Sequence, residues 1–596
     1  MKSYLTSLWI LCAFVFGAGA RTYTVDAVRG RDTNDGSRAA PFATPQRGVD
    51  AAMPGDTVFV RAGRYRGRVV FARSGEPGSP IVLEGERGAI LDGGEPVSGW
   101  RPAPEVGAGV FKKELTMAGW PVPYRPYNMT WNNKLVLHIN DAKMKDGTGV
   151  QRLKEPPESA EWDHIEALYG TKGKMTYLRF RDRRDPNTGE ITVGPHWQYD
   201  SAATVSVIGQ RHIVVRGFRI RNRTVGVYLR RGASDNVIEN NTIVGGRWGV
   251  GIGFSWWNLK DARLVPDPAH VDVAPLLCHR NHIRNNQITL RFLARLGPYP
   301  VIYASRNVRK WHWHQFKVFS DNDREAVALC NAGHENEVYG NHIFEHWGGV
   351  QDWTGGKSWR SDEFSIPRDA FCQRLKVYGN LIHDILDDAL EPTGGEIDAE
   401  WHDNTVYRAN VAIRQKGIGR GPAYIYRNRC IAPSGCAVFY FADTRAPVYF
   451  YHNTFSSALG LRMPTRRPAK AANTWWINNI FSTLRFWEPI KSAETMQTHF
   501  DYNLCAGPDF RNRVSWRDEP DVRWFGAHNT IVPDKPLWGS KNRDVPLSAT
   551  SPARAKGIDL SKPWTVDGKA HAPLPGMKPG YFRGRAPDLG AVQHDE

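Results

Sequence analysis

WHDNTVY (401–407) is followed by IYRNRCI (425–431) and FYHNTFS (450–456), and these three stretches decide the fold. Each centres an asparagine in a short run that mixes apolar and polar residues. The pattern recurs at Asn241, Asn286, Asn341, Asn380, Asn404, Asn428, Asn453, Asn479 and Asn503. From Asn380 onward the steps are 24, 24, 25, 26 and 24 residues. A period in this range indicates a solenoid.

The units are rich in Val, Ile, Tyr and Phe, in runs broken by Gly, Asn or Asp, so they are predicted to be strands joined by turns. The leucine framework of leucine-rich repeats is missing from these units, which excludes that fold. A propeller is excluded because it needs about 40 residues per blade. We therefore expect an all-β protein, a right-handed parallel β-helix with three strands in each coil of about 24 residues. Asparagine tolerates left-handed geometry at a turn, and its amide can bond to the equivalent residue one coil away.

Three earlier steps are longer, at 45, 55 and 39 residues. One coil plus a loop explains each, and the excess falls near 254–278, 291–335 and 353–372. Loops of this length on a rigid scaffold usually form walls or lids of functional sites.

The chain begins with Met1 and Lys2, an apolar run from Leu5 to Phe16 and small residues up to Ala20. This order predicts a signal peptide over 1–20, hence a secreted or periplasmic protein, and no other run is long enough for a membrane span. The formal net charge of +17 favours a polyanionic partner, although a solvated basic surface would serve solubility equally well. We expect a monomer that binds an anionic polysaccharide rather than nucleic acid. The six cysteines after residue 20 could pair in an oxidising compartment or remain buried thiols.

Both ends of the chain resemble secreted right-handed parallel β-helix proteins of the pectate-lyase-like kind. At the start, a segment at about Pro45 to Ala52 precedes PGDTVFVRAGRYRG (54–67), and the chain closes on RAPDLGAVQ (585–593). The resemblance implies a short helix that caps the first coils within 21–98. We predict a β-rich insertion over 99–200 and the main β-helix over 201–596.

Equivalent positions in successive coils form columns, because parallel strands stack about 4.8 Å apart. Counting eleven residues from the repeat asparagines reaches Asp352 and Glu391, and ten and twelve residues from Asn404 reach Arg414 and Lys416. Asp387 and Asp388 lie beside Glu391 in the sequence. We expect these acids and bases to lie on one outer face. Alternation along the strand would place Val411 and Ile413 inward and Ala412, Arg414 and Lys416 outward.

Such a column suits β-elimination in a uronic-acid polymer, which needs a base and positive charge to stabilise the enolate. We assign Lys416 as the base and Arg414 as the neutralising cation, with His383 as a proton carrier. Asp352, Asp387, Asp388 and Glu391 are the predicted Ca²⁺ ligands. The DDxxE of 387–391 followed by Lys416 is similar to the calcium-and-lysine site of family 9 pectate lyases, except that a glutamate replaces an aspartate.

Aromatic and polar residues near the predicted loops are candidates for contacts with sugar. Indole rings stack on the CH faces of sugars, so we predict substrate contacts from His346, Trp347, Trp353 and Arg420.

Two other functions fit the same scaffold. Paired carboxylates, Asp352 with Glu391 or Asp387, could make the protein a glycoside hydrolase. A surface protein that binds glycans without cleaving them is the third hypothesis, because fold alone does not decide activity.

Overall fold

The computed structural model describes residues 19–115, 126–138, 150, 153, 166–196, 199–253, 274–291, 324–352, 372–394, 396–418, 420–432, 436–441, 446–457, 461–462, 473–481, 498–506, 526–532, 547, 550–566 and 568–593. The predicted signal peptide falls almost entirely outside this range. None of the described helices is long and apolar enough to cross a membrane.

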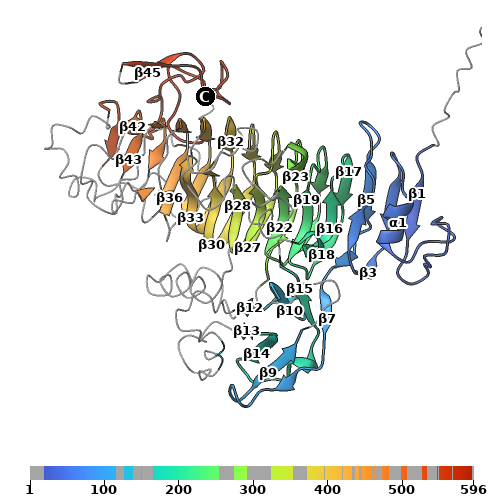
Figure 1. Cartoon of the computed structure of the whole chain (residues 1–596). Helices are drawn as coiled ribbons and strands as arrows, with labels where there is room; N and C mark the ends of the chain where they lie inside the picture. Colours follow the sequence, from blue (N-terminus) through green and yellow to red (C-terminus); the bar gives the residue numbers. More distant parts are fainter. Residues whose placement is uncertain are drawn as a thin grey trace, which may run out of the picture.

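The described residues form a right-handed parallel β-helix, which confirms the predicted fold (Figure 1). Its coils stack along one axis, from α1 (Pro45–Ala51) and the first strand at one end to the last strands of the stack at the other. One wall is a sheet of thirteen strands, ordered β1 (Thr22–Val25), β2 (Thr57–Val60), β5 (Ile81–Gly85), β17 (Ile213–Arg216), β20 (Val237–Glu239), β23 (His282–Arg284), β26 (Glu337–Tyr339), β29 (Lys376–Tyr378), β32 (Ala399–His402), β34 (Ala423–Tyr426), β37 (Val448–Tyr451), β40 (Thr474–Ile477) and β42 (Thr498–Asp501).

The other two walls are joined into one sheet, because two long strands, β30 (Leu381–Glu391) and β33 (Thr405–Ile418), run through both. The wall that follows the repeat asparagines contains β3 (Gly63–Arg66), β6 (Ala89–Asp92), β18 (Arg219–Arg221), β21 (Thr242–Val244), β24 (Gln287–Thr289), β27 (His342–His346), β35 (Arg429–Ala432), β38 (Thr454–Ser457), β41 (Ile480–Phe481), β43 (Leu504–Ala506) and β44 (Thr530–Val532). The third wall contains β4 (Val69–Phe71), β16 (Ala203–Ile208), β19 (Val225–Arg230), β22 (Trp248–Gly253), β25 (Glu325–Cys330), β28 (Gly348–Asp352), β31 (Thr393–Gly394), β36 (Cys436–Phe441) and β39 (Leu461–Arg462).

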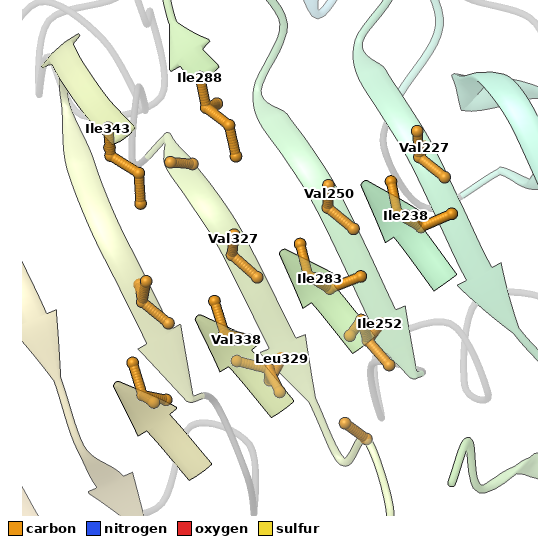
Figure 2. Close-up of a cluster of buried hydrophobic side chains, with 14 of the residues drawn as sticks. Val227, Ile238, Val250, Ile252, Ile283, Ile288, Val327, Leu329, Val338 and Ile343 are labelled. Carbon is orange, nitrogen blue, oxygen red and sulfur yellow. The ribbon is translucent and has the colours of Figure 1, made fainter. Parts of the chain in front are cut away.

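The interior is filled by aliphatic side chains that repeat from coil to coil. Val227, Val250 and Val327 lie at paired positions of β19, β22 and β25 and are fully buried. Figure 2 shows this row with Ile238 and Ile283 from the thirteen-stranded sheet, all within the same hydrophobic core. Burial of these rows gives the solenoid its main favourable free energy.

The repeat asparagines form a continuous hydrogen-bonded ladder, as predicted. The side-chain amide of Asn380 donates to Oδ1 of Asn404 at 2.9 Å, and Asn404 donates to Asn428 at 3.0 Å. The ladder runs from Asn241 to Asn503 and continues to Asn529, which was not among the predicted repeat asparagines.

The left-handed backbone conformation does not belong to the ladder asparagines, and this part of the prediction is wrong. It belongs to the residue before each of them, such as Gly379 (φ 62°), Asp403 (φ 54°) and Arg427 (φ 50°). The turn is therefore made one residue earlier, which leaves the asparagine side chain pointing inward to bond along the stack.

The predicted insertion is a pair of small sheets, antiparallel except where β12 pairs with β13 in parallel, that begins at β7 and returns to the helix at β16 (Figure 1). Its strands are β7 (Glu95–Val97), β8 (Arg101–Pro102), β9 (Val110–Glu114), β10 (Asn128–Trp131), β11 (Lys134–Leu135), β12 (Leu137–His138), β13 (Ala167–Lys172), β14 (Met175–Phe180) and β15 (Ile191–Gly194). Leu135 and Leu137 of the insertion share a buried apolar cluster with Leu290, Trp347 and Leu386 of the helix. The insertion thus packs on the outside of the β-helix, against the coils that carry these three residues.

The C-terminal segment covers the far end of the thirteen-stranded sheet. It carries a hairpin of β45 (Trp564–Val566) and β46 (Lys569–His571). Leu560 and Trp564 share a buried cluster with Tyr426, Tyr451 and Trp475 of the sheet. The aromatic residues on this outer face are therefore sealed from water.

Five cysteines are buried free thiols in the described part of the chain, namely Cys278, Cys330, Cys372, Cys430 and Cys505. Of the two alternatives left open by the sequence, the thiol is the one observed at these positions.

Two acids lie inside the solenoid, where charge is costly. Glu396 is fully buried and accepts a hydrogen bond from Nε1 of Trp401 at 2.9 Å. Asp352 is also fully buried and accepts from the Cys372 thiol at 3.3 Å. Burial and the neighbouring carboxylate of Asp352 hold the pKa of Glu396 well above its usual value of 4.5.

A raised pKa in the folded protein makes stability fall as pH rises. Above about pH 4.5 the unfolded chain releases the Glu396 proton while the folded chain still holds it, so the stabilisation is lost between pH 4.5 and the raised pKa. We expect Glu396→Gln to lose less stability than the wild type over this window. Thermal melts of both proteins from pH 4.5 to 9 measure the difference, and parallel curves would contradict the assignment.

Candidate active site

The third wall presents two outward columns that bring polar residues together. The first runs through Trp248 and Glu325 to Gly348. Val350 pairs with Leu390, and the same register places Asp388 next to Gly348 in this column. Asp388 pairs in turn with the apolar Val411, where the polar part of the column ends.

The second column runs through Ala328, Gln351 and Glu391, and then reaches Phe439 through Arg414. Glu391 and Arg414 lie side by side because Leu390 pairs with Ile413, one residue earlier on each strand. The expected neighbourhood of Glu391, Asp388 and Arg414 on one outer face is therefore observed.

Asp352 does not belong to this face, so its predicted alignment with Glu391 is wrong. Gln351 pairs with Glu391, and Asp352 pairs with the core residue Leu329 and points into the interior. The cause is an irregularity in β30, which uses three residues from Ile385 to Asp388 where β33 uses two. A β-bulge adds one residue to a strand, so counting from Asn341 and Asn380 loses register by one.

The expected alternation in β33 is also wrong at its start. Ala412 and Ile413 both belong to the hydrophobic core, whereas Val411 continues the outward column of Asp388. Two consecutive inward residues mark the bend between two walls of the helix, where the small side chain fits the corner.

Arg414 organises the acids of this face. Its Nη2 lies 3.2 Å from Asp387 Oδ1, and its Nε lies 2.5 Å from Asp388 Oδ2. The side chains are 13%, 7% and 6% exposed, respectively, so water screens these ion pairs only weakly. Arg414 thus holds both aspartates in ion pairs on this face.

Glu325 is a site residue that counting from the repeat asparagines did not identify. It is almost completely buried and accepts a hydrogen bond from Trp248 Nε1 at 2.8 Å. The sequence contains a signal for Glu325 in the triplets WGV, EAV, GGV, DAL and VAI, which start at residues 248, 325, 348, 388 and 411. Each has an outward residue followed by a small residue and an aliphatic one, so aligning on this triplet finds the column that the asparagine count misses.

The insertion holds the residue before Glu325. Arg324 is fully buried and donates to Asn128 Oδ1 at 3.2 Å and to the carbonyl of Gly246 at 2.8 Å. Burial lowers the pKa of Arg324 to about 10, so it remains a cation at neutral pH. The insertion therefore anchors the start of β25.

Lys416 and Arg420 follow Arg414 along the chain. The backbone of Lys416 pairs with that of Thr393, in the column beside Glu391 and Arg414, and its side chain lies outside the described atoms. Arg420 lies just beyond β33 and is exposed. Their predicted roles remain predictions.

His383 lies on the preceding wall, where its ring stacks between Phe344 and Tyr407. Its nitrogens contact Asp384 and His342, not Asp388 or Arg414. The described geometry does not connect His383 with the acids of the outer columns.

Two predicted sugar-binding residues are buried, which contradicts that role. His346 is 1% exposed, and burial together with Arg324 lowers the pKa of its imidazole to about 3. Trp347 is 2% exposed and packs against the insertion. Trp353 lies outside the described residues.

The proposed calcium ligands do not converge. Asp352 points inward, and Asp387 and Asp388 are engaged by Arg414. Among the described residues, no group of three or more His, Cys, Asp or Glu side chains is placed to hold a metal ion. Asp352 therefore does not share a face with the other three predicted ligands, and Ca²⁺ binding by these carboxylates remains a prediction.

Comparison with known proteins adds to the assignment of the fold. No protein-family model and no curated protein matches the chain. XylC, solved in complex with xylose, is 15% identical with a TM-score of 0.52, over 87% of this chain and 86% of that one. Pectate lyase Pel9A is 12% identical with a TM-score of 0.41 over 97% of both chains, and the PL6 polysaccharide lyase Pedsa3628 from Pseudopedobacter saltans is 10% identical with a TM-score of 0.38 over 85% and 96%. At 15% identity the likeness to XylC concerns the fold alone, and the parallel β-helix predicted from the sequence is the fold observed.

Proposed function

We propose that this protein is a carbohydrate-active enzyme that hydrolyses a polysaccharide on the outward columns of the third wall. One observation carries the proposal. Glu325 and Asp388 stand in the same column on either side of Gly348, a position that places no side chain between the two acids.

The spacing suits a glycoside hydrolase. Two rungs of a parallel sheet separate the two backbones by roughly 9–10 Å. Inverting glycosidases hold their carboxyl groups about 6.5–9.5 Å apart, which leaves room for the glycosidic bond and a water molecule. A Cβ added at Gly348 would lie 3.6 Å from Glu325 Cγ and 3.6 Å from the Asp388 carbonyl, so the glycine lies directly between them.

The surroundings of the two acids suggest their roles. Asp388 forms an ion pair with Arg414, and a carboxylate in this setting suits the general base that activates water. Glu325 is 6% exposed, and such burial disfavours the charged form of a carboxyl group, which suits the general acid. Gln351 and Glu391, in the neighbouring column, can accept and donate hydrogen bonds to sugar hydroxyl groups.

β-Elimination is the second candidate. It is favoured by the strand position of Lys416, one column from Arg414, where a base and a cation would flank the substrate. The net charge of +17 supports an anionic polysaccharide in either case. We also propose that the protein acts outside the cytoplasm as a single chain.

A product assay separates the two reactions. Purified protein is incubated with pectate, alginate, glycosaminoglycans and neutral glycans, with and without a chelator. We expect new reducing ends without the ultraviolet absorbance of an unsaturated uronate, and we expect Lys416→Ala to retain the activity. Absorbance that Lys416→Ala abolishes would establish the lyase instead, and glycan retention without any cleavage would contradict both.

A further inference from the structure

Two imidazole rings converge on the wall that follows the asparagine ladder. Nε2 of His342 lies 2.8 Å from Nε2 of His383. The two residues belong to the neighbouring strands β27 and β30, which are paired through Phe344 and His383. Both side chains are partly exposed.

His383 is held in one orientation by its surroundings. Its Nδ1 lies 2.6 Å from Asp384 Oδ2, and the same carboxylate is paired with Arg408. The ring also stacks on Tyr407 at 4.5 Å and on Phe344 at 5.7 Å between centroids. A proton donated from Nδ1 to a carboxylate leaves Nε2 as a lone pair, which is the arrangement typical of metal-ligating histidines.

A similar unit without a second histidine occurs on another wall, the thirteen-stranded sheet, at the end of β32. His402 Nδ1 lies 2.6 Å from Asp403 Oδ2, and Arg427 is paired with that carboxylate. Within the described part of the chain, the ring contacts of His402 are Tyr378 and Tyr426. The Asp–His–Arg unit is thus a repeated structural element, and the convergent imidazole of His342 is what distinguishes the first copy.

We propose that His342 and His383 bind a divalent transition-metal ion of the zinc type. Zn²⁺ takes histidine nitrogens at about 2.0–2.1 Å in a tetrahedral arrangement, which places two nitrogens roughly 3.3 Å apart. The rings need to separate by only about half an ångström from their present contact. His342 then carries its proton on Nδ1, and water completes the coordination. This site is separate from the proposed hydrolytic columns and does not depend on them.

Calorimetric titration of the metal-free full-length protein with ZnCl₂ at pH 7.5 tests the site. We expect one bound equivalent to be lost in His342→Gln and in His383→Gln. Asp384→Asn should weaken the affinity by about 10- to 100-fold, as for other outer-shell partners of metal ligands. His402→Gln is the matched control and should bind as the wild type does.

The two histidine variants also decide against the proposal if it is wrong. Absence of Zn²⁺ binding by the wild type, or unchanged stoichiometry in His342→Gln, would show that the pair is only an N–H···N hydrogen bond. Because His342 is partly exposed, its replacement should leave the thermal unfolding temperature without metal near that of the wild type, so a failure to fold in His383→Gln does not obscure the result.

Discussion

Replacing Asp388 by asparagine should lower kcat for polysaccharide hydrolysis by about 10²- to 10⁴-fold, the contribution typical of a general base. Asparagine keeps the shape of the side chain and a contact with Arg414, but it cannot take a proton from water. Glu325→Gln should reduce kcat over the same range, because the leaving oxygen then lacks its acid. Initial rates on the substrate identified by the product assay measure both effects.

The matched control is Asp403→Asn. Asp403 also forms an ion pair with an arginine, Arg427, but it lies on another wall of the helix. Its replacement should leave kcat within about twofold of the wild type, and melting temperatures verify that all three variants are folded. Full activity in both Asp388→Asn and Glu325→Gln would rule out this pair as the catalytic acids.

Replacing Asn404 by alanine should lower the free energy of unfolding by about 3–5 kcal/mol. The Asn404 side chain accepts from the backbone and side chain of Asn380 and donates to Asn428 and to the carbonyl of Val377. Alanine leaves these groups buried without their partner, and each unsatisfied group costs about 1–3 kcal/mol. Denaturation by urea, followed by circular dichroism, measures the loss.

Asn529→Ala provides the comparison for this effect. Asn529 makes the same type of contacts with Asn503 at the last described rung of the ladder, but it is only partly buried. Water can replace some of its bonds, so the loss should be clearly smaller than for Asn404→Ala. Equal losses at the two positions would show that burial does not set the contribution of the ladder hydrogen bonds to stability.

The asparagine period predicted the fold because the repeat acts locally. Each coil needs its own turn, strands and inward amide, so the signal recurs in every 24 to 26 residues of the later coils. The capping helix and the insertion were also visible, the first through resemblance and the second through the loss of the period. Only the position of the left-handed turn residue was misplaced, by one residue.

The composition of the outer face was predicted less well. Asp387, Asp388, Glu391 and Arg414 lie together as expected, because they lie close to ladder residues on consecutive coils. Asp352 was misplaced by the irregularity in β30, and Glu325 was missed because a long loop separates it from the preceding asparagine.

The sequence by itself determined the parallel β-helix, its coil length and the coils that carry the acids, because each of these follows from residues close together in the chain. Tertiary structure alone decided which side chains face outward and which are buried. A single extra residue in β30 shifted the register between Asp352 and Glu391, and packing of the insertion buried Trp347. Both outcomes depend on contacts between segments far apart in the chain, and a local sequence pattern carries no information about such contacts.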